Sequence, residues 1–384
     1  MAWNNIIGHD RIKKILQKAI VGDRVAGAYC LWGIPGIGKE ALAIEFARAA
    51  NCENPSIAPD SIESCGQCKS CRDIDELNHP NLNLVFPLPA GKGSDSKSDS
   101  PYSSLSDQQI DEIQEQIRAK SGDPYYKIIP TNATQIKIAS IRDVKKKLTL
   151  SGSRRGRRCI LISSAEMLTG EAANAFLKTL EEPHPGVTIF MVTSRPDMLL
   201  PTIMSRCQQI RCEPLTDGQI ASALVERHDI DPDNARLVAV YGRGSYVRAL
   251  EFLGEDMRRL RTDMVDMLRT SMKKRRFRLE LLEQIDELIK TSDKSRLETA
   301  LNILLMWMRD ANMLRLIDSA EGMINQDQRD TIEKFIKVFP DADLAESIEK
   351  IDNAIRDIRR NVNPQLIFAG LFLELREIFI ENSL

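Results

Sequence analysis

The sequence predicts an α/β domain with a parallel sheet, followed by a small α-helical domain and a C-terminal α-helical bundle. Up to about residue 212, short apolar runs of strand type alternate with helical segments, which is typical of parallel sheets covered on both faces. From about residue 215 the strand-type runs stop, and long charged amphipathic helices follow. We therefore expect three domains, at residues 1–213, 214–253 and 254–384.

The first 50 residues predict a helix, a strand, a glycine-rich turn and a second helix. The first helix follows Asp10, and its apolar residues recur at helical spacing: Ile12, Ile15, Leu16 and Ala19. Residues 28–32 form a short apolar run that ends at the turn, so we expect a buried strand there. Residues 39–50 are rich in strong helix formers.

Helices and strands alternate again between residues 136 and 212. The expected elements are a helix at 138–148, a strand at 158–162, a helix at 172–180, and strands at 187–192 and 208–212. Residues 90–125 interrupt this pattern, because they are polar and contain few apolar side chains. We interpret this segment as a flexible insertion with a short amphipathic helix near 107–118, and a tolerated surface loop is the simpler alternative.

The composition is that of a globular protein, with 42% hydrophobic and 28% charged residues among 384. The formal net charge of −2 excludes a polycation that coats nucleic acid, so any DNA contact would come from a local patch. No apolar run approaches the ~20 residues that span a bilayer, and the first residues lack the pattern of a signal peptide. We expect a cytoplasmic protein without membrane contact.

The glycine-rich turn at residues 33–40 fits the phosphate-loop pattern G-x-x-x-x-G-K. Gly33, Gly36 and Gly38 would let backbone N–H groups approach phosphates, and Lys39 would meet the terminal phosphate. The next residue normally carries a hydroxyl that ligates Mg²⁺, but here it is Glu40. A carboxylate could still reach a metal, so this change alone leaves nucleotide binding open.

A second change concerns the end of the strand at 158–162. An ATPase has acidic residues there to hold Mg²⁺ and polarise water, whereas this chain continues with Ser163, Ser164, Ala165 and Glu166. A serine does not act as a general base at neutral pH without an activating neighbour. Two parts of the catalytic machinery are therefore altered together, and we expect no ATP hydrolysis, with ATP or ADP binding doubtful.

Four of the eight cysteines are clustered. Cys52, Cys65, Cys68 and Cys71 have the spacing C-x12-C-x2-C-x2-C, which suits one tetrahedral zinc ion. Four thiolates leave no open position, so the predicted zinc is structural. The other four lie in or beside apolar strands and are expected to be core thiols: Cys30, Cys159, Cys207 and Cys212.

Three blocks in the middle of the chain point to a family. The blocks at residues 175–183, 188–194 and 200–207 resemble the AAA+ clamp-loader subunits, which include the bacterial gamma, tau and delta-prime proteins and the replication factor C subunits. The resemblance implies an AAA+ P-loop domain, a helical lid domain and a C-terminal collar domain. Delta-prime subunits commonly lack the hydroxyl and acidic residues of the ATPase site, so the departures seen here favour the delta-prime branch.

The resemblance also implies roles for individual residues. Arg206, in a Ser-Arg-Cys motif, would be an arginine finger that acts in trans on ATP bound by a neighbouring subunit. Thr193 and Ser194 fall at the sensor-1 position, and Arg248 falls at the sensor-2 position that senses phosphate. The cysteine cluster corresponds to the zinc module at the end of the family's P-loop helix.

The function implied by the resemblance is that of a non-hydrolysing delta-prime subunit of the DNA polymerase III clamp loader. It would form a heteropentamer with gamma/tau-type and delta-type subunits, and load the sliding clamp onto primer–template DNA. The basic runs at 145–147 and 154–158 would touch DNA phosphates or be merely solvated. Two alternatives stay open: an ATP-hydrolysing gamma/tau-type subunit, and a zinc-containing scaffold that binds single-stranded DNA.

Helices at the C-terminal end carry two further segments that resemble the family's collar domain, at residues 304–310 and 361–366. Residues 366–379 are strongly apolar. We expect them to form a helix that is buried within its own domain, and burial against a neighbouring subunit is the alternative.

Overall fold

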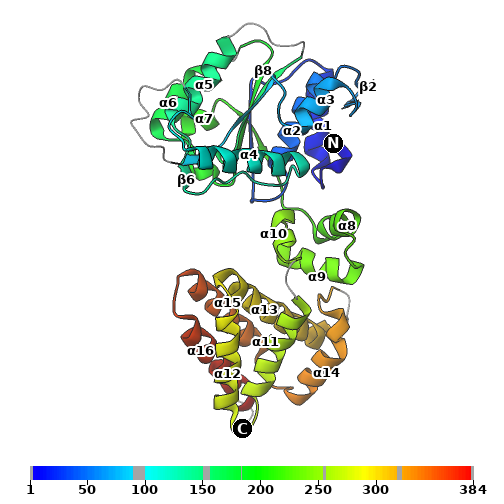
Figure 1. The fold of residues 1–384 in the computed structure, drawn as a ribbon. Coiled ribbons are helices and arrows are strands. Elements are labelled where there is room, and N and C mark those ends of the chain that lie inside the picture. Colours follow the sequence, from blue (N-terminus) through cyan, green and yellow to red (C-terminus); the bar gives the residue numbers. More distant parts are fainter. Residues whose placement is uncertain are drawn as a thin grey trace. The chain divides into compact units, whose positions relative to one another are not determined.

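The structure is a computed structural model that describes residues 3–89, 100–149, 156–182, 184–253, 257–317 and 322–381. It divides into two compact units (Figure 1). The α/β unit comprises residues 1–223 and 244–247, and the helical unit comprises residues 224–243 and 248–384. The helices of the expected lid domain at 214–253 are shared between these two units, and the division into three domains stays a prediction.

A five-stranded parallel sheet forms the centre of the α/β unit, which confirms the predicted fold class. In sheet order the strands are β4 (Leu82–Val85), β7 (Arg158–Ile162), β8 (Val187–Thr193), β1 (Ala28–Trp32) and β9 (Gln208–Arg211). All seven residues of β8 are buried, as expected for a central strand covered on both faces. Four of the five strands lie where the sequence predicts them, and the edge strand β4 was not predicted.

Helices cover both faces of this sheet, with α1, α2 and α3 on one side and α5, α6 and α7 on the other (Figure 1). The helices of the unit are α1 (Asp10–Val21), α2 (Lys39–Asn51), α3 (Lys69–Asp75), α4 (Asp107–Gly122), α5 (Ile138–Thr149), α6 (Gly170–Glu181) and α7 (Pro201–Met204), and α8 (Asp217–His228) starts in it. The core on the side of α5 and α6 is formed by aliphatic side chains around Phe176, Ile160 and Ile189, all fully buried.

The segment predicted to be a flexible insertion is partly helical. Residues 90–99 lie outside the described residues, but α4 begins at a capping box between Ser106 and Gln109 and continues to Gly122. Ile113 of α4 packs with Phe86, Leu88 and Ile128 in a small apolar cluster. Two small antiparallel sheets complete the unit: β2 (Ser56–Ala58) with β3 (Ser61–Glu63), and β5 (Leu88–Pro89) with β6 (Ala133–Gln135).

The helical unit contains the end of α8 and eight further helices among its described residues. These are α9 (Pro232–Gly242), α10 (Tyr246–Glu251), α11 (Met257–Ser271), α12 (Phe277–Lys290), α13 (Lys294–Ile317), α14 (Arg329–Val338), α15 (Leu344–Arg359) and α16 (Pro364–Arg376). Its core includes an aromatic cluster in which the rings of Trp307, Phe339 and Phe379 surround Phe335.

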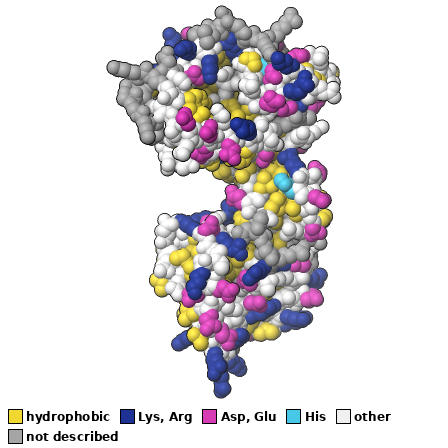
Figure 2. Space-filling view, viewed as in Figure 1, with side chains coloured by type: hydrophobic (Ala, Val, Ile, Leu, Met, Phe, Trp, Pro, Cys, Tyr) yellow, Lys and Arg dark blue, Asp and Glu magenta, His cyan; other side chains and the backbone are white. Residues whose placement is uncertain are grey.

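Helix α16 is buried as predicted on one face, through Ile367, Phe368 and Phe372, whereas Leu366 is 70% exposed. No described helix is long and apolar enough to cross a bilayer. Basic and acidic side chains are interspersed over the visible face of each unit (Figure 2), in line with the near-neutral net charge.

Candidate nucleotide site, arginine finger and metal centre

The phosphate loop connects β1 to α2 and packs closely against other parts of the α/β unit. Gly36 and Gly38 have φ angles of 75° and 95°, which side-chain-bearing residues rarely adopt. A Cβ atom on Gly36 would lie 2.3 Å from Ser245 Oγ, and one on Gly38 would lie 2.9 Å from Cε1 of Tyr125. The glycines are thus required here by backbone conformation and by these neighbouring side chains.

The side chain of Lys39 is turned onto its own loop. Its Nζ donates hydrogen bonds to the carbonyl oxygens of Gly33 (2.8 Å) and Ile34 (2.6 Å), and lies 3.4 Å from Ser194 Oγ. The residue is 6% exposed, and this burial lowers the pKa of the ammonium group to about 8. The predicted sensor-1 residue Ser194 is therefore next to the phosphate-loop lysine.

Glu40 takes part in a buried ion pair that the sequence did not reveal. One carboxylate oxygen accepts a hydrogen bond from Ser163 at the end of β7, and the other pairs with Lys120 of α4. The Lys120 side chain is 2% exposed and also donates to the carbonyl oxygens of Tyr126 (2.7 Å) and Pro124 (3.3 Å). The position of the missing Mg²⁺-binding hydroxyl is thus held by an internal pair of opposite charges.

The charge state of Glu40 follows from these contacts. Burial, the largest single effect, acts to raise its pKa, but the ammonium of Lys120, the Ser163 hydroxyl and Lys127 together bring the pKa below the usual value. Glu40 is consequently ionised at neutral pH. A Mg²⁺ ion at this carboxylate would have to displace an ammonium group that is already enclosed by protein.

Tyr125 closes the same region from the loop after α4. Its hydroxyl accepts a hydrogen bond from the backbone N–H of Ile7 (2.8 Å), and its ring packs edge-to-face on Tyr246 at 4.9 Å between centroids. The backbone N–H of Val247 donates to the carbonyl oxygen of Gly36 (3.2 Å). Lys120 and Tyr125 were both missed by sequence reasoning, since no motif or spacing marks them.

The other two predicted sensor residues are engaged elsewhere. Thr193, at the end of β8, is 1% exposed and accepts a hydrogen bond from the backbone N–H of Arg195 (3.0 Å). Arg248 belongs to the helical unit, where its guanidinium lies 3.7 Å from a carboxylate oxygen of Glu298 on α13. Their roles as sensors stay predictions.

Arg206 follows α7, and its guanidinium is held in a defined position. Nε and Nη2 lie 2.9 and 2.6 Å from one carboxylate oxygen of Glu181, at the end of α6. Nη1 donates to the carbonyl oxygen of Thr202 (2.9 Å) and to Ser205 Oγ (3.2 Å). One third of the side chain, 33%, remains exposed. Sequence reasoning also missed Glu181 as the partner of the predicted finger.

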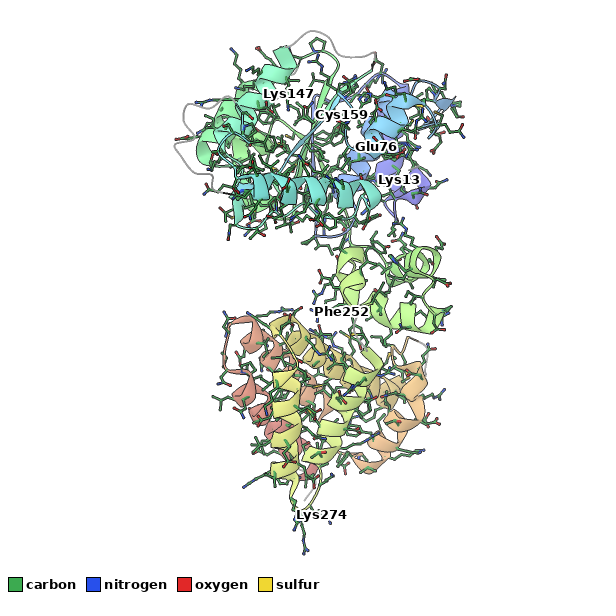
Figure 3. All side chains as sticks on the ribbon, in the orientation of Figure 1. Lys13, Glu76, Lys147, Cys159, Phe252 and Lys274 are labelled. Carbon is green, nitrogen blue, oxygen red and sulfur yellow. The ribbon has the colours of Figure 1, made fainter. Side chains whose placement is uncertain are left out.

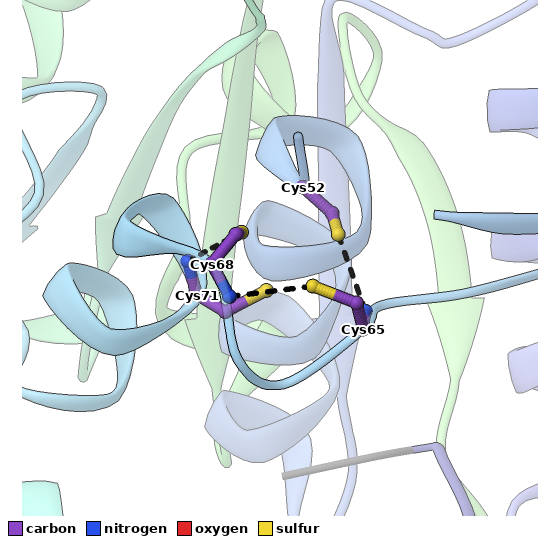
Figure 4. Close-up of side chains that lie close together, drawn as sticks. All are labelled: Cys52, Cys65, Cys68 and Cys71. Carbon is purple, nitrogen blue, oxygen red and sulfur yellow. Dashed lines mark hydrogen bonds between the residues drawn. The ribbon is translucent and has the colours of Figure 1, made fainter. Parts of the chain in front are cut away.

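The four clustered cysteines come together in space (Figure 4). Their sulfur atoms all lie within 4.8 Å of one another, and sulfurs bound to one tetrahedral zinc at 2.3 Å are separated by about 3.8 Å. Cys52 follows α2, Cys65 lies after β3, Cys68 caps α3, and Cys71 lies within α3. This donor set fits a zinc ion without any open ligand position.

Backbone N–H groups in the cluster point at three of its four sulfur atoms. The N–H groups of Cys65, Cys68 and Cys71 point at the sulfurs of Cys52 (3.2 Å), Cys65 (3.4 Å) and Cys68 (3.4 Å). Backbone hydrogen bonds from Gln67 and Cys68 lower the pKa of Cys65 to about 6. A thiolate is the form of cysteine that ligates metal.

The other four cysteines are buried, as predicted. Burial raises the pKa of Cys30 to about 12 and that of Cys207 to about 11, so both are protonated at neutral pH. Cys159, which is labelled in Figure 3, lies on β7 and is 1% exposed. These thiols contribute to the core.

Several side chains of the predicted basic region make contacts within the protein. Lys147 of α5, labelled in Figure 3, pairs with Asp143 at 2.8 Å, and Lys145 donates to the carbonyl oxygen of Ala175. Arg158 donates to the carbonyl oxygens of Lys147 and Leu148. Arg154 and Arg155 lie outside the described residues. DNA contact by this region stays a prediction.

Fold and site together define the class of protein. A parallel sheet with a phosphate loop between its strand β1 and helix α2 is that of a P-loop nucleoside-triphosphatase, and the blocks around α6 and β8 are of AAA+ type. Residues 8–216 match the family described as "DNA polymerase III, delta subunit". Residues 259–377 match the family described as "DNA polymerase III, delta subunit, C terminal". The chain belongs to the DNA polymerase III delta-prime family of clamp-loader subunits.

Two relatives named delta′ agree with this assignment, and a tau subunit and a solved structure are also similar to this chain. DNA polymerase III subunit delta′ of Bacillus subtilis is 26% identical over 367 residues, which cover 96% of both chains. Subunit delta′ of Pseudomonas aeruginosa is 29% identical over 65% of this chain and 62% of its own length. Subunit tau of Bacillus subtilis is 22% identical over 95% of this chain and 60% of its own length. A solved gamma subunit-related protein from Thermotoga maritima covers 96% of this chain and 98% of its own at 17% identity, with a TM-score of 0.39.

Proposed function

We propose that this chain is a non-hydrolysing subunit of a heteropentameric clamp loader. In it, the chain joins gamma/tau-type and delta-type subunits, helps load the sliding clamp onto primer–template DNA, and presents Arg206 to ATP held by a neighbouring subunit. The proposed lack of ATP hydrolysis is supported by the buried contact of Glu40 with Lys120 and Ser163.

The physical reason concerns Mg²⁺. Hydrolysis by a P-loop protein needs a hydroxyl that ligates Mg²⁺ and an acidic residue that holds the metal. Here the hydroxyl is replaced by a carboxylate that Lys120 already neutralises, and the acidic residue after β7 is replaced by Ser163. The ammonium group of Lys120 repels a second cation. The chain's own site is therefore proposed not to turn over ATP.

The position of Arg206 supports its proposed action on ATP held by a neighbouring subunit. A guanidinium against the γ-phosphate offsets the charge that develops in phosphoryl transfer, and arginine fingers accelerate this reaction by about 10³–10⁵-fold. Glu181 and the Thr202 carbonyl fix the orientation of Arg206, so little side-chain entropy is lost when it meets a phosphate. The partly exposed guanidinium is available to a second chain.

Zinc bound by Cys52, Cys65, Cys68 and Cys71 is proposed to be structural. The cluster connects the end of α2 to α3 through side chains distant in sequence, as a metal cross-link does. When bound, zinc would contribute cross-linking of these segments and no chemistry at the nucleotide site.

The test is a reconstituted loader with gamma-type and delta-type partners. Arg206→Ala is expected to lower the DNA-stimulated ATPase rate by at least tenfold, whereas Arg211→Ala, which removes a 61% exposed arginine of the same unit, leaves it within twofold. The isolated chain is expected to show no ATPase activity. An unchanged rate in Arg206→Ala would remove the proposed role of this residue.

One observation favours the alternative of an ATP-hydrolysing gamma/tau-type subunit. Subunit tau of Bacillus subtilis is similar along 95% of this chain, and Gly36, Gly38 and Lys39 of the phosphate loop are present. ATP turnover by the isolated chain that is lost in Lys39→Ala would establish this alternative in place of the first.

A further inference from the structure

One buried cation lies beside the cysteine cluster without a role in the proposed function. Arg48 occupies the last turn of α2, and its side chain is 3% exposed. Its Nη2 lies 3.2 Å from the position that a Cβ on Gly66 would take, in the turn between Cys65 and Cys68.

Two acidic side chains lie beside this arginine, and burial raises the pKa of one of them, Glu45, to about 8. Arg48 Nη1 donates to Asp75 at the end of α3 (3.2 Å) and lies 3.7 Å from Glu45, one turn earlier on α2. Its Nε is buried and has no hydrogen-bond partner among the described residues. A buried guanidinium with an unused donor is costly unless it faces a further negative group.

With zinc bound, the zinc–tetrathiolate centre would supply that negative group. Four thiolates around one Zn²⁺ carry a net charge of −2, and this charge would lie in a part of the protein where Cys71 is fully buried. Arg48 is a buried cation beside the turn that joins Cys65 to Cys68. It can therefore offset part of the charge at the place where water is excluded.

We propose that Arg48 is the counter-charge of the zinc–tetrathiolate centre, held in place by Asp75. This inference rests on the proposed zinc site. It makes Arg48 a positioning residue for the metal, and it couples zinc binding to the last turn of the helix that begins at the phosphate loop. Partners outside the ligand sphere typically change metal affinity by about 10–100-fold when they are removed.

The test measures zinc affinity of the full-length chain by competition with a chromophoric chelator, with zinc content per chain measured in parallel. Arg48→Gln, which keeps a polar side chain and removes the charge, is expected to weaken zinc binding by about 10–100-fold. Arg48→Lys keeps a cation and is expected to stay within about threefold of wild type. Arg72→Met, which removes an exposed arginine on α3, is the control and is expected to match wild type.

The outcomes distinguish failure of the zinc site from failure of the role of Arg48. Wild-type protein without zinc would refute the metal site itself, and with it the inference. Wild-type protein that holds zinc no more tightly than Arg48→Gln would leave the metal site intact and refute the role of Arg48. If Arg48→Gln does not fold, Arg48→Lys decides: affinity within threefold supports the proposal, and a loss of more than tenfold contradicts it because the charge would be present and insufficient.

Discussion

Removing one partner of the Glu40–Lys120 pair is expected to destabilise the α/β unit strongly. The two side chains are 13% and 2% exposed, so Lys120→Met leaves the Glu40 carboxylate largely buried without its counter-charge. Loss of one partner from a buried pair costs about 3–5 kcal/mol. For a unit of this size, each kcal/mol lowers the melting temperature by roughly 2–4 °C. We therefore expect the thermal transition to fall by about 10 °C.

The assay is thermal unfolding of five proteins, the wild type and four variants, followed by circular dichroism. Lys120→Met and Glu40→Gln are compared with the double variant, which removes both charges and is expected to lose less than the sum of the two. The control is Lys18→Met, which breaks an ion pair with Asp60 whose side chains are 55% and 74% exposed. That change is expected to cost under about 1 kcal/mol.

The effect of Lys120→Met should also depend on pH. Because the pKa of Glu40 is lowered in the folded protein, its contribution to stability is present above the unfolded-state pKa of about 4.3 and is lost as the pH falls through the lower folded value. The difference between wild type and Lys120→Met should thus shrink as the pH falls below about 4. If Lys120→Met melts within 2 °C of wild type at neutral pH, the pair does not hold the site as described.

Two further predictions concern backbone and core. Gly38→Ala is expected to lower the free energy of unfolding in urea by about 1–3 kcal/mol, because φ is +95° and the new methyl group would meet Tyr125. The control Gly170→Ala, whose new methyl group meets nothing within 4 Å, should be neutral or stabilising. Equal stabilities of the two variants would contradict this. In the helical unit, Phe368→Ala should lower the free energy of unfolding by about 3–5 kcal/mol, because the ring is fully buried. Leu366→Ala, on the exposed side of α16, should lower it by less than about 0.5 kcal/mol. A reversed order of the two melting temperatures would show that the helix is packed differently.

Patterns that are local in sequence were enough for much of the fold and for two parts of the site. Strands β1, β7 and β8 could be predicted because central parallel strands are nearly continuous apolar runs, whereas the predicted β9 is an edge strand with one buried residue, Ile210. The phosphate loop and the cysteine cluster could be predicted because their chemistry fixes the spacing between glycines and between thiolates.

Other elements could not be predicted because their sequences carry weak local signals. The strand β4 is four residues long and includes Asn83, so it is not a continuous apolar run. Helix α4 was expected to end near Arg118, but it continues to Gly122 and so includes Lys120. Residues 100–125 are polar for the most part, and their order comes from packing against Phe86, Leu88 and Ile128.

By itself, the sequence determined that Glu40 stands where the phosphate-loop pattern has a hydroxyl and that Ser163 follows the strand β7, and it predicted from these two changes that the chain does not hydrolyse ATP. Only the tertiary structure decided that these two side chains meet, that Lys120 completes the pair, and that Arg206 has Glu181 as its partner. The physical reason is distance along the chain. Glu40 and Ser163 are 123 residues apart, and only the folding of the parallel sheet brings the end of β7 to the start of α2.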